Sequence, residues 1–444
     1  MEVPVAVDTL ALFTQKPVQT AMTGYQILNI LPSNENISTS STIEFDFPLS
    51  GNPMYYDLGH TNLFIEFETL KVADGTKATG VLPTAASGYV KGAYINMPTS
   101  SFFSDVRFLI YDKVCESTGN MYPYQSMIHD ILMYTKEYRD EILIHSGYAD
   151  EMSDAAATNP DSETNPGFVK HVTSFKSAES ERFVGRINIG MFKQAVKIPG
   201  FVKMRLVLTK AALAFIILDP ALTAATEAAK VKIALKKVRL EVHAVDVQPI
   251  IYQAHLDGLK SQNMVYHFTR ECVVSETVAQ GSLGKVWSNA FPTSQVPKLI
   301  VLTMVRSDAF TGSNKYNPFH FQHFNVNYIQ LTVNAKPVPY VEPFQPTAWD
   351  KLQYLREYKT LDSIGEGRHG ISPLAYANGH FFLVFNLCPD LIIDGAAEAI
   401  QTGGVSLDIR FSAGLSQPIN ILLYAQFDNS VQITKDKDVI HDFI

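Results

Sequence analysis

The strongest constraint in this sequence is an alternation of apolar and polar residues with a period of two. It is clearest in segments 43–49, 238–244 and 405–411, where every second residue is apolar. Successive side chains of a β-strand point to opposite faces, so each segment has one buried and one solvated face. Strands of a buried parallel sheet are apolar throughout, so the alternation favours antiparallel sheets. The sequence therefore predicts an all-β protein.

Further strands and a few helices complete the predicted elements. The turns between strands are rich in Gly, Pro, Asn and Asp, as in 50–53 and 311–314. Apolar residues at helical spacing occur in 124–136 and 348–361, and more weakly in 250–262. The further strands are predicted at 62–70, 105–113, 182–189, 201–209, 263–274, 298–306, 325–333, 381–387 and 419–427.

The two stronger helices indicate an internal repeat. Each follows a strand and a short proline-containing loop: strand 106–111 leads through 122–124, and strand 326–333 leads through 337–340. The second helix lies about half a chain length after the first, so two tandem copies of one β-sandwich explain the pattern. A coincidence between two strand–helix segments also fits it.

This repeat suggests a division of the chain into three parts. The first is an N-terminal arm at 1–40, which lacks the alternation and contains three prolines. The first β unit is predicted at 41–250 and the second at 251–444, with the linker at 247–262.

The charge balance bears on possible partners. Lys and Arg number 36 and Asp and Glu 44, which gives a net charge of −8 at pH 7. A protein that works mainly on nucleic acid carries an excess of basic residues, so we expect no sequence-specific nucleic-acid binding. One basic run is interpreted as a solvated strand face, although contact with nucleic acid or an acidic neighbour stays open. It consists of Lys230, Lys232, Lys236, Lys237 and Arg239.

The cysteines and the first residues bear on the compartment. Cys115, Cys272 and Cys388 stand far apart, which predicts neither a disulfide framework nor a Cys-x-x-Cys metal site. We expect small buried thiols in a reducing compartment. The chain begins without the basic segment of a secretory signal, and no apolar stretch approaches the roughly 18 residues of a membrane helix. We therefore expect a protein that is neither secreted nor membrane-spanning.

Several motifs suggest chemistry, but none has the pattern that its chemistry requires. The string Gly365–Gly370 matches G-x-G-x-x-G, yet a predicted helix precedes it and Pro373 follows it, unlike a dinucleotide fingerprint. His320 and His323 would face opposite sides of a strand and would not share a metal.

Two loops fail in the same way. Gly281–Lys285 lacks the spacing of a phosphate loop, and the acidic loop 149–167 lacks the spacing of a calcium loop. The sequence thus predicts no catalytic, cofactor-binding or metal-binding residue and no enzyme. Trp287 and Trp349 are predicted anchors, in the core or at an interface.

Several stretches, in their order along the chain, carry a family resemblance. In the second half they are Ser307–Gly312, Asn317–Phe324, Tyr376–Gly379 and Phe385–Leu391; in the first half they are Tyr122–Tyr124 and Val184–Arg186 before Phe192. With them the chain resembles the double jelly-roll major capsid proteins of Polinton (Maverick) elements, adintoviruses and related DNA viruses of the adenovirus–virophage lineage. The resemblance covers most of the chain after residue 40. Asn386 departs from it, because the family pattern has Asp at that position.

The resemblance implies two eight-stranded antiparallel jelly rolls with short helices in the loops. It implies that three chains form a pseudo-hexameric capsomer and that capsomers tile an icosahedral shell around a DNA genome. The implied partners are further copies of the chain and a penton or minor capsid protein. The implied location is the virion, with synthesis in the host cytoplasm or nucleus. The alternatives are a minor capsid component, a lectin-like jelly-roll module, or an enzyme on a β-sandwich.

Overall fold

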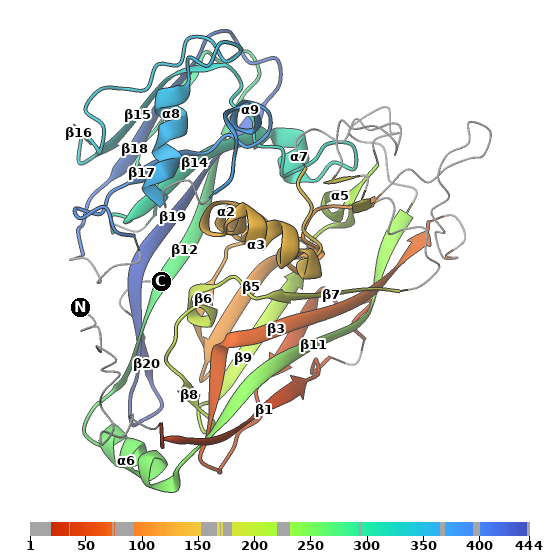
Figure 1. Ribbon diagram of the computed structural model, residues 1–444, viewed down its shortest axis with the longest axis vertical. Helices are drawn as coiled ribbons and strands as arrows, with labels where there is room; N and C mark the ends of the chain where they lie inside the picture. Colours follow the sequence, from red (N-terminus) through yellow and green to blue (C-terminus); the bar gives the residue numbers. More distant parts are fainter. Residues whose placement is uncertain are drawn as a thin grey trace, which may run out of the picture.

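The computed structural model of the chain describes residues 19–34, 36–72, 75, 93–151, 167–168, 170–171, 180–219, 231–292, 295–364, 369–393 and 400–441. Residues 1–18, most of the acidic loop, Lys230 and residues 365–368 of the glycine string lie outside these ranges. In Figure 1 the strands gather in two groups, with the first half of the chain below and the second half above.

The first half contains two antiparallel sheets. One has the order β1-β11-β3-β7, with the short β8 added to β3, and the other has the order β2-β9-β5-β6. A small pair, β4 (Ala93–Tyr94) and β10 (Ile217–Leu218), lies apart from them. The strands are β1 (Met22–Ile30), β2 (Thr42–Asp46), β3 (Met54–Lys71), β5 (Phe103–Ile110), β6 (Lys113–Ser117), β7 (Glu181–Arg186), β8 (Ile198–Pro199), β9 (Met204–Lys210) and β11 (Val231–Val247).

The second half repeats this plan. Its sheets have the orders β12-β19-β14-β17, with β20 added to β19, and β13-β18-β15-β16. The strands are β12 (Met264–Val278), β13 (Gly284–Trp287), β14 (Leu299–Arg306), β15 (Val326–Val333), β16 (Lys336–Pro337), β17 (Leu383–Asn386), β18 (Val405–Phe411), β19 (Ile419–Ile433) and β20 (Val439–His441).

The two halves have the same connectivity. When the short β4, β8, β10 and β20 are set aside, each half orders its strands first-eighth-third-sixth in one sheet and second-seventh-fourth-fifth in the other. Two facing sheets with this connectivity form an eight-stranded jelly roll. The predicted all-β fold, with two tandem antiparallel jelly rolls, is therefore confirmed.

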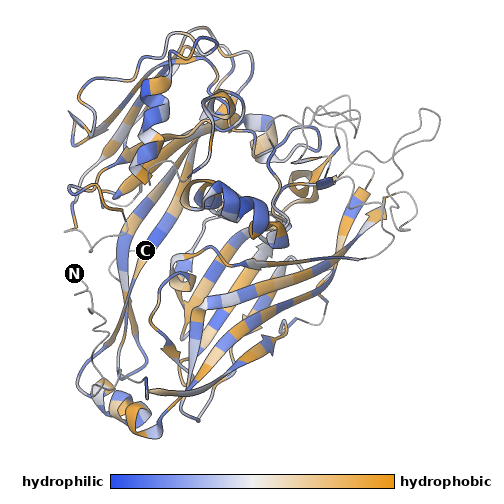
Figure 2. Ribbon diagram, viewed as in Figure 1, coloured by the Kyte–Doolittle hydropathy of each residue, from blue (hydrophilic) through white to orange (hydrophobic). Residues whose placement is uncertain are grey.

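The burial of the strands follows the alternation only where one face is wet. In β18 every second residue is buried, whereas nearly every residue of β14 and β19 is buried. The sheet of β14 and β19 is covered by its partner sheet on one face and by helical segments on the other (Figure 1). Figure 2 shows the alternation itself in β3 and β11, which are banded in alternating colours.

The predicted N-terminal arm at 1–40 is wrong for residues 22–30. These residues form β1, which pairs with β11 from Met22 to Ile30. Because β1 is an edge strand whose residues are mostly exposed, its sequence shows little alternation. Only Leu28 and Ile30 pack toward the core.

The helices match the predictions in part. The helix predicted at 124–136 is α2 (Tyr122–Met133), with Pro123 in its first turn rather than in a loop, and α6 (Pro249–Leu259) occupies the predicted 250–262. The other helical segments are α1 (Pro98–Ser101), α3 (Lys136–Glu141), η1 (Leu143–Ser146), η2 (Gly190–Phe192), α5 (Leu213–Ile216), α7 (Ser307–Thr311), α8 (Leu355–Tyr358), η3 (Lys359–Ile364) and α9 (Pro373–Ala377).

The helix predicted at 348–361 is wrong over its first half. Residues 349–354 form turns, and the helix begins at Leu355 as α8. Leu352 has a φ of 57°, a left-handed conformation that interrupts a right-handed helix. Leu352 and Leu355 are both exposed, so the apolar spacing did not mark a buried stripe.

Two smaller points complete the comparison with the sequence. The strand predicted at 105–113 is divided into β5 and β6 by a tight turn, in which Tyr111 and Asp112 have positive φ angles. Among the described residues, no helix combines the length and the apolar character that a membrane crossing requires.

Candidate functional site at the interface of the two jelly rolls

Helix α2 lies between the two jelly rolls (Figure 1) and is buried over nearly its whole length. Residues four apart share a face of a helix, so Gln125 and His129 project together, as do Ser126 and Asp130. These polar side chains are all buried. A helix covered on all sides must satisfy its polar groups inside the protein, and here it does so with residues of both halves.

Glu271 of β12 is the centre of this buried polar region. Its two carboxylate oxygens accept hydrogen bonds from Lys193 Nζ at 2.8 and 2.9 Å. His129 Nδ1 lies 3.1 Å from Glu271 Oε1, and Gln125 Nε2 donates to Oε2 at 3.4 Å. Glu271 belongs to the second jelly roll and the other three to the first, so the carboxylate joins the halves. We call Glu116, Gln125, His129, Asp130, Lys193 and Glu271 the Glu271 cluster.

Two further carboxylates of the first half complete the cluster. Glu116 of β6 accepts hydrogen bonds from the backbone N–H groups of Gly190 and Met191 at 2.7 and 2.9 Å. Asp130 accepts from Asn188 Nδ2 with both oxygens at 3.0 Å. The cluster therefore holds three carboxylates close to one lysine and one histidine.

The environment gives the three carboxyl groups different pKa values. Burial raises the pKa of Glu116 to about 7 and that of Asp130 to about 6, although hydrogen bonds and nearby cations oppose the rise. Burial acts on Glu271 in the same direction, but Lys193 and His129 outweigh it and hold its pKa far below the usual range. Glu271 is thus the carboxylate of the three that stays ionised, because Lys193 and His129 both contact it directly.

Gly190 allows the two halves to approach closely beside this cluster. A Cβ atom at Gly190 would lie 2.3 Å from the Thr269 carbonyl oxygen and 2.6 Å from the Phe268 ring. Both belong to β12 of the second jelly roll. Only glycine permits this separation of η2 and β12.

Arg139 makes a second polar contact between the halves. Its guanidinium donates to the carbonyls of Ile131 and Tyr134 at 2.6 and 2.8 Å, where α2 ends, and to the His369 carbonyl at 2.7 Å. His369 lies in the second half. Cationic side chains stabilise the carbonyl end of a helix, and here the same cation holds a segment of the other jelly roll.

An aromatic cluster forms the apolar part of the same interface. Tyr124 of α2 stacks on Phe310 at 5.5 Å between ring centroids and meets Phe319 edge to face at 5.8 Å. Phe215 of α5 meets Phe319 at 6.1 Å. We call Tyr124, Phe215, Phe310 and Phe319 the aromatic cluster; two of its rings come from each half.

The arrangement positions the jelly rolls rather than presenting a reactive group. Lys193, His129 and Glu271 satisfy one another, and the Glu271 carboxylate is fully enclosed. A cavity of about 250 Å³ lies beside the cluster, with Asp130, Tyr134 and Arg186 in its wall. In this wall Asp130 accepts hydrogen bonds from the Asn188 side chain.

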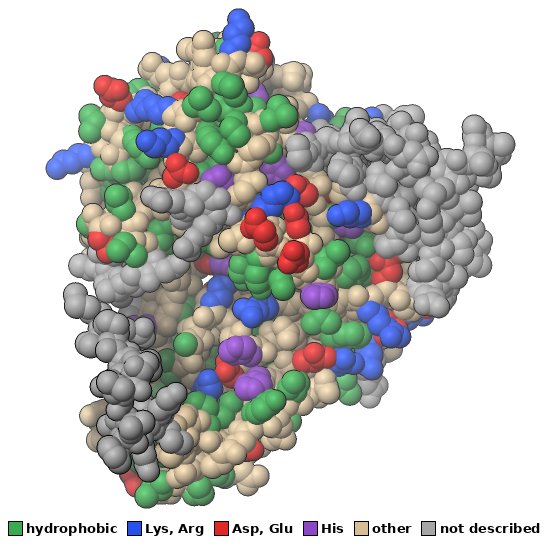
Figure 3. Space-filling view, viewed as in Figure 1, with side chains coloured by type: hydrophobic (Ala, Val, Ile, Leu, Met, Phe, Trp, Pro, Cys, Tyr) green, Lys and Arg blue, Asp and Glu red, His purple; other side chains and the backbone are tan. Residues whose placement is uncertain are grey.

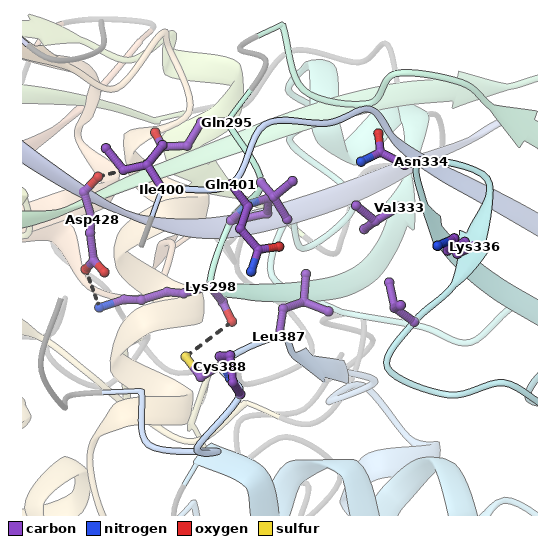
Figure 4. Close-up of a pocket in the computed structure, with 14 residues that line it drawn as sticks. Gln295, Lys298, Val333, Asn334, Lys336, Leu387, Cys388, Ile400, Gln401 and Asp428 are labelled. Carbon is purple, nitrogen blue, oxygen red and sulfur yellow. Dashed lines mark hydrogen bonds and ion pairs between the residues drawn. The ribbon is translucent and has the colours of Figure 1, made fainter. Parts of the chain in front are cut away.

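A larger cavity, of about 320 Å³, lies in the second jelly roll (Figure 4). Its walls include Val333, Leu387 and Gln401. Lys298 in the wall is paired with Asp428 at 3.0 Å and donates to Thr269 Oγ1 at 3.1 Å, so its charge is compensated. The Cys388 thiol donates to the Lys298 carbonyl at 3.7 Å.

The histidine pair singled out in the sequence is placed in separate surroundings. His320 Nδ1 contacts Gln322 Nε2 at 2.9 Å, whereas His323 stacks on Trp349 at 3.9 Å and accepts from the Asn325 N–H. Burial lowers the pKa of His323 to about 4. Within the described ranges, no three His, Cys, Asp or Glu side chains converge as ligands of one metal ion.

The other sequence candidates also take structural positions. The expected loop Gly281–Lys285 enters β13 at Gly284, and Lys285 pairs with Glu276. Trp287 packs half-buried on the core, and Trp349 donates its indole N–H to the Val326 carbonyl at 3.1 Å. Among the cysteines, Cys115 and Cys388 are buried but Cys272 is only half-buried, contrary to expectation.

The basic run is divided among several contacts, as expected of a solvated strand face. Lys236 pairs with Glu68 at 3.0 Å. Arg239 pairs with Glu241 at 2.7 Å and lies over the Phe64 ring. The sheet therefore balances these charges with its own carboxylates.

Sequence reasoning did not find the Glu271 cluster. In segment 264–274, alternation places Glu271 with His267 and Thr269 on the polar face of the strand. That face is covered by the first jelly roll where Glu271 lies. A carboxylate that is solvated in an isolated sheet is therefore buried by the second unit.

Comparison with known proteins supports the fold. No protein-family model and no curated protein sequence matches the chain. Among solved structures, a chain of the Sputnik virophage aligns with a TM-score of 0.65 at 10% identity, over 99% of this chain and 93% of that one. The mavirus major capsid protein aligns with a TM-score of 0.54 at 12% identity, over 100% and 95%. The PBCV-1 virus capsid model aligns with a TM-score of 0.57 at 11% identity, over 97% and 99%.

The chain has the fold of these capsid structures. The alignments cover both jelly rolls and nearly the full length of each matched chain. At these identities the comparison shows the fold alone.

Proposed function

We propose that this chain is a viral major capsid protein. Three copies would form a capsomer, and capsomers would tile an icosahedral shell around a DNA genome. The observation that carries the proposal is the full-length match of both jelly rolls to capsid structures. The buried Glu271 cluster supports it, because a fixed angle between two similar units lets a trimer present six similar lobes.

Finer assignments are part of the same proposal. We place the chain with the Polinton and adintovirus-like group, on the motifs around Asn317–Phe324 and Phe385–Leu391. It would work without enzymatic activity, in the virion, after synthesis in the host cytoplasm or nucleus. Its partners would be further copies of itself and a penton or minor capsid protein.

We also propose a division of the chain into jelly rolls at 41–250 and 251–444, with β1 added to the first. Helix α6 would be the linker, within the predicted 247–262.

Exposed apolar side chains support self-assembly. Ile250 is 74% exposed and Val341 is 77% exposed, and Tyr25 of β1 is 71% exposed. Single exposed apolar residues are common, but surfaces for assembly need such side chains. They lie on both jelly rolls and on α6, as a subunit with several neighbours requires.

The test is the mass of the purified full-length protein by light scattering, followed by negative-stain microscopy. We expect three times the mass of one chain, with hexagonal outlines, or closed shells. A monomer that never assembles over a range of salt and pH would contradict the proposal and favour a ligand-binding jelly-roll module.

A further inference from the structure

Strand β3 carries an unusual bulge beside β11. The pairing places Asn62 opposite Glu241 and Asp57 opposite His243, so four residues of β3, 58–61, lie opposite the single residue Val242 of β11. The extra residues include His60, whose side chain is 69% exposed to solvent. Bulges of this kind re-aim side chains at functional surfaces.

The bulge gathers one lysine and two histidines around one buried carboxylate. Asp57 Oδ2 lies 2.8 Å from Lys197 Nζ, 3.1 Å from His60 Nδ1 and 3.8 Å from His243 Nδ1. Burial acts to raise the pKa of Asp57, but the hydrogen bonds from Lys197 and His60 outweigh it and hold that pKa below the usual range. His243 Nδ1 is itself buried and has no hydrogen-bond partner among the described residues.

Apolar residues of β1 border these groups. The Tyr25 ring lies 5.1 Å from the His243 ring, and Ile27 stands opposite His243 in the pairing. Tyr25 is 71% exposed and Ile27 is 62% exposed. We call Tyr25, Ile27, His60, Lys197 and His243 the histidine patch. The charges that face it are those of Asp57 on β3 and the Arg239–Glu241 pair on β11.

Helix α3 and the segment after it carry the complementary chemistry. Glu137, Asp140 and Glu141 are exposed, and only Asp140 among them is paired with a described cation, Lys136. Ile142 and Ile144 follow and are also exposed. We call Glu137, Asp140, Glu141, Ile142 and Ile144 the acidic patch. Figure 3 shows acidic side chains over the α2–α3 region and histidines over β3 and β11 on the same broad face.

We propose that this face binds the same face of a second copy of the chain. The histidine patch of each copy contacts the acidic patch of the other. Two complementary patches on one face fit a two-fold contact, in which the same pair of contacts occurs twice. A three-fold ring would need them on different sides. The pairing joins neighbouring capsomers, and in that respect it rests on the proposed function.

Charge and apolar contact both contribute to this pairing. The exposed Glu137 and Glu141 of one copy face His60 and Lys197 of the other, and Tyr25 and Ile27 face Ile142 and Ile144. Attraction between exposed charges is screened by salt. The association between copies therefore weakens as the salt concentration rises.

The experiment measures association of the full-length protein by sedimentation velocity at pH 7 in low and in high salt. We expect the wild type to associate at least tenfold more strongly in low salt. His60→Glu adds a negative charge to the histidine patch, and the double variant Glu137→Lys/Glu141→Lys reverses charges of the acidic patch, so each should lose this gain. Combining all three substitutions exchanges the signs and should restore association in low salt. Glu342→Lys, an exposed change on the second jelly roll, is the matched control and should behave as the wild type.

Each outcome decides the inference. Failure of the combined variant to regain association, or a wild type insensitive to salt, would overturn it. Dissociation of the trimer itself in the charge-reversed variants would also overturn it, because the patches would then lie within the capsomer. If the wild type never forms trimers but pairs in low salt through these residues, the inference holds and the proposed capsid function fails.

Discussion

The Glu271 cluster and the aromatic cluster lie at the same interface between the jelly rolls, but the first consists of polar and charged side chains and the second of aromatic rings. The first buries a carboxylate against a lysine and a histidine, and the second packs four rings. Burial of aromatic rings stabilises the contact between the jelly rolls, but it depends little on their relative orientation. A buried ion pair adds little net stability, yet it costs much when one partner is removed, so it penalises wrong orientations. The rings hold the halves together, and the charges select one angle.

The largest expected effect comes from removing the central carboxylate. Glu271→Ala leaves the buried His129 and the partly exposed Lys193 without their anion, which should cost about 2–4 kcal/mol of stability at pH 7. Urea unfolding measures it. Glu276→Ala on the same strand is the control, because Glu276 and its partner Lys285 are each about one-third exposed and the pair should contribute below about 1 kcal/mol. Equal losses in the two variants would contradict the role given to Glu271.

Closing the gap at Gly190 should have the next largest effect. In Gly190→Ala the new Cβ meets the Thr269 carbonyl, so η2 and β12 must separate, at a cost of about 1–3 kcal/mol. Gly258→Ala in α6 is the matched control, since nothing lies within 4 Å of its Cβ, and it should be neutral or stabilising. The midpoint of thermal unfolding compares them. A neutral Gly190→Ala would show that the interface accepts a wider spacing.

The third prediction concerns pH. The pKa of Asp130 is raised by burial to about 6, so the folded state binds this proton more tightly than the unfolded state does. The stabilising contribution is complete below about pH 4 and is lost as the pH rises through about 6. Asp130→Asn should remove this loss, leaving the protein more stable at pH 7 by about 1–3 kcal/mol and little changed near pH 4. Thermal midpoints at the two pH values test it, and an unaltered pH profile would refute it.

The smallest effect is expected in the aromatic cluster. The Tyr124 hydroxyl is buried and has no hydrogen-bond partner within the described part of the chain. Tyr124→Phe should therefore be neutral or stabilising by up to about 1 kcal/mol, because an unsatisfied polar group is removed. Tyr124→Leu, which also removes the stacked ring, should be destabilising. Urea unfolding of both variants separates the hydroxyl from the ring, and a clear loss in Tyr124→Phe would reveal a partner for the hydroxyl.

The sequence predicted the elements well where burial depends on one sheet alone. Segment 405–411 alternates and forms β18, because one of its faces meets the core and the other meets water. The helix predicted over 348–361 was wrong in its first half, because the apolar residues of this segment have helical spacing without forming a buried face. Edge strand β1 was missed for the converse reason, since a mostly exposed strand needs no alternation.

By itself, the sequence determined the antiparallel strands, because local alternation and turn residues encode them, and a repeated strand–helix segment indicated two similar units. Tertiary structure alone decided which polar residues are buried. Glu271 lies on the polar face of its strand, and it becomes the centre of the interface only because the first jelly roll covers that face. The same packing brings Gln125, His129 and Lys193 to it from distant positions in the chain. A buried carboxylate is stable only with such partners, and no local pattern places them.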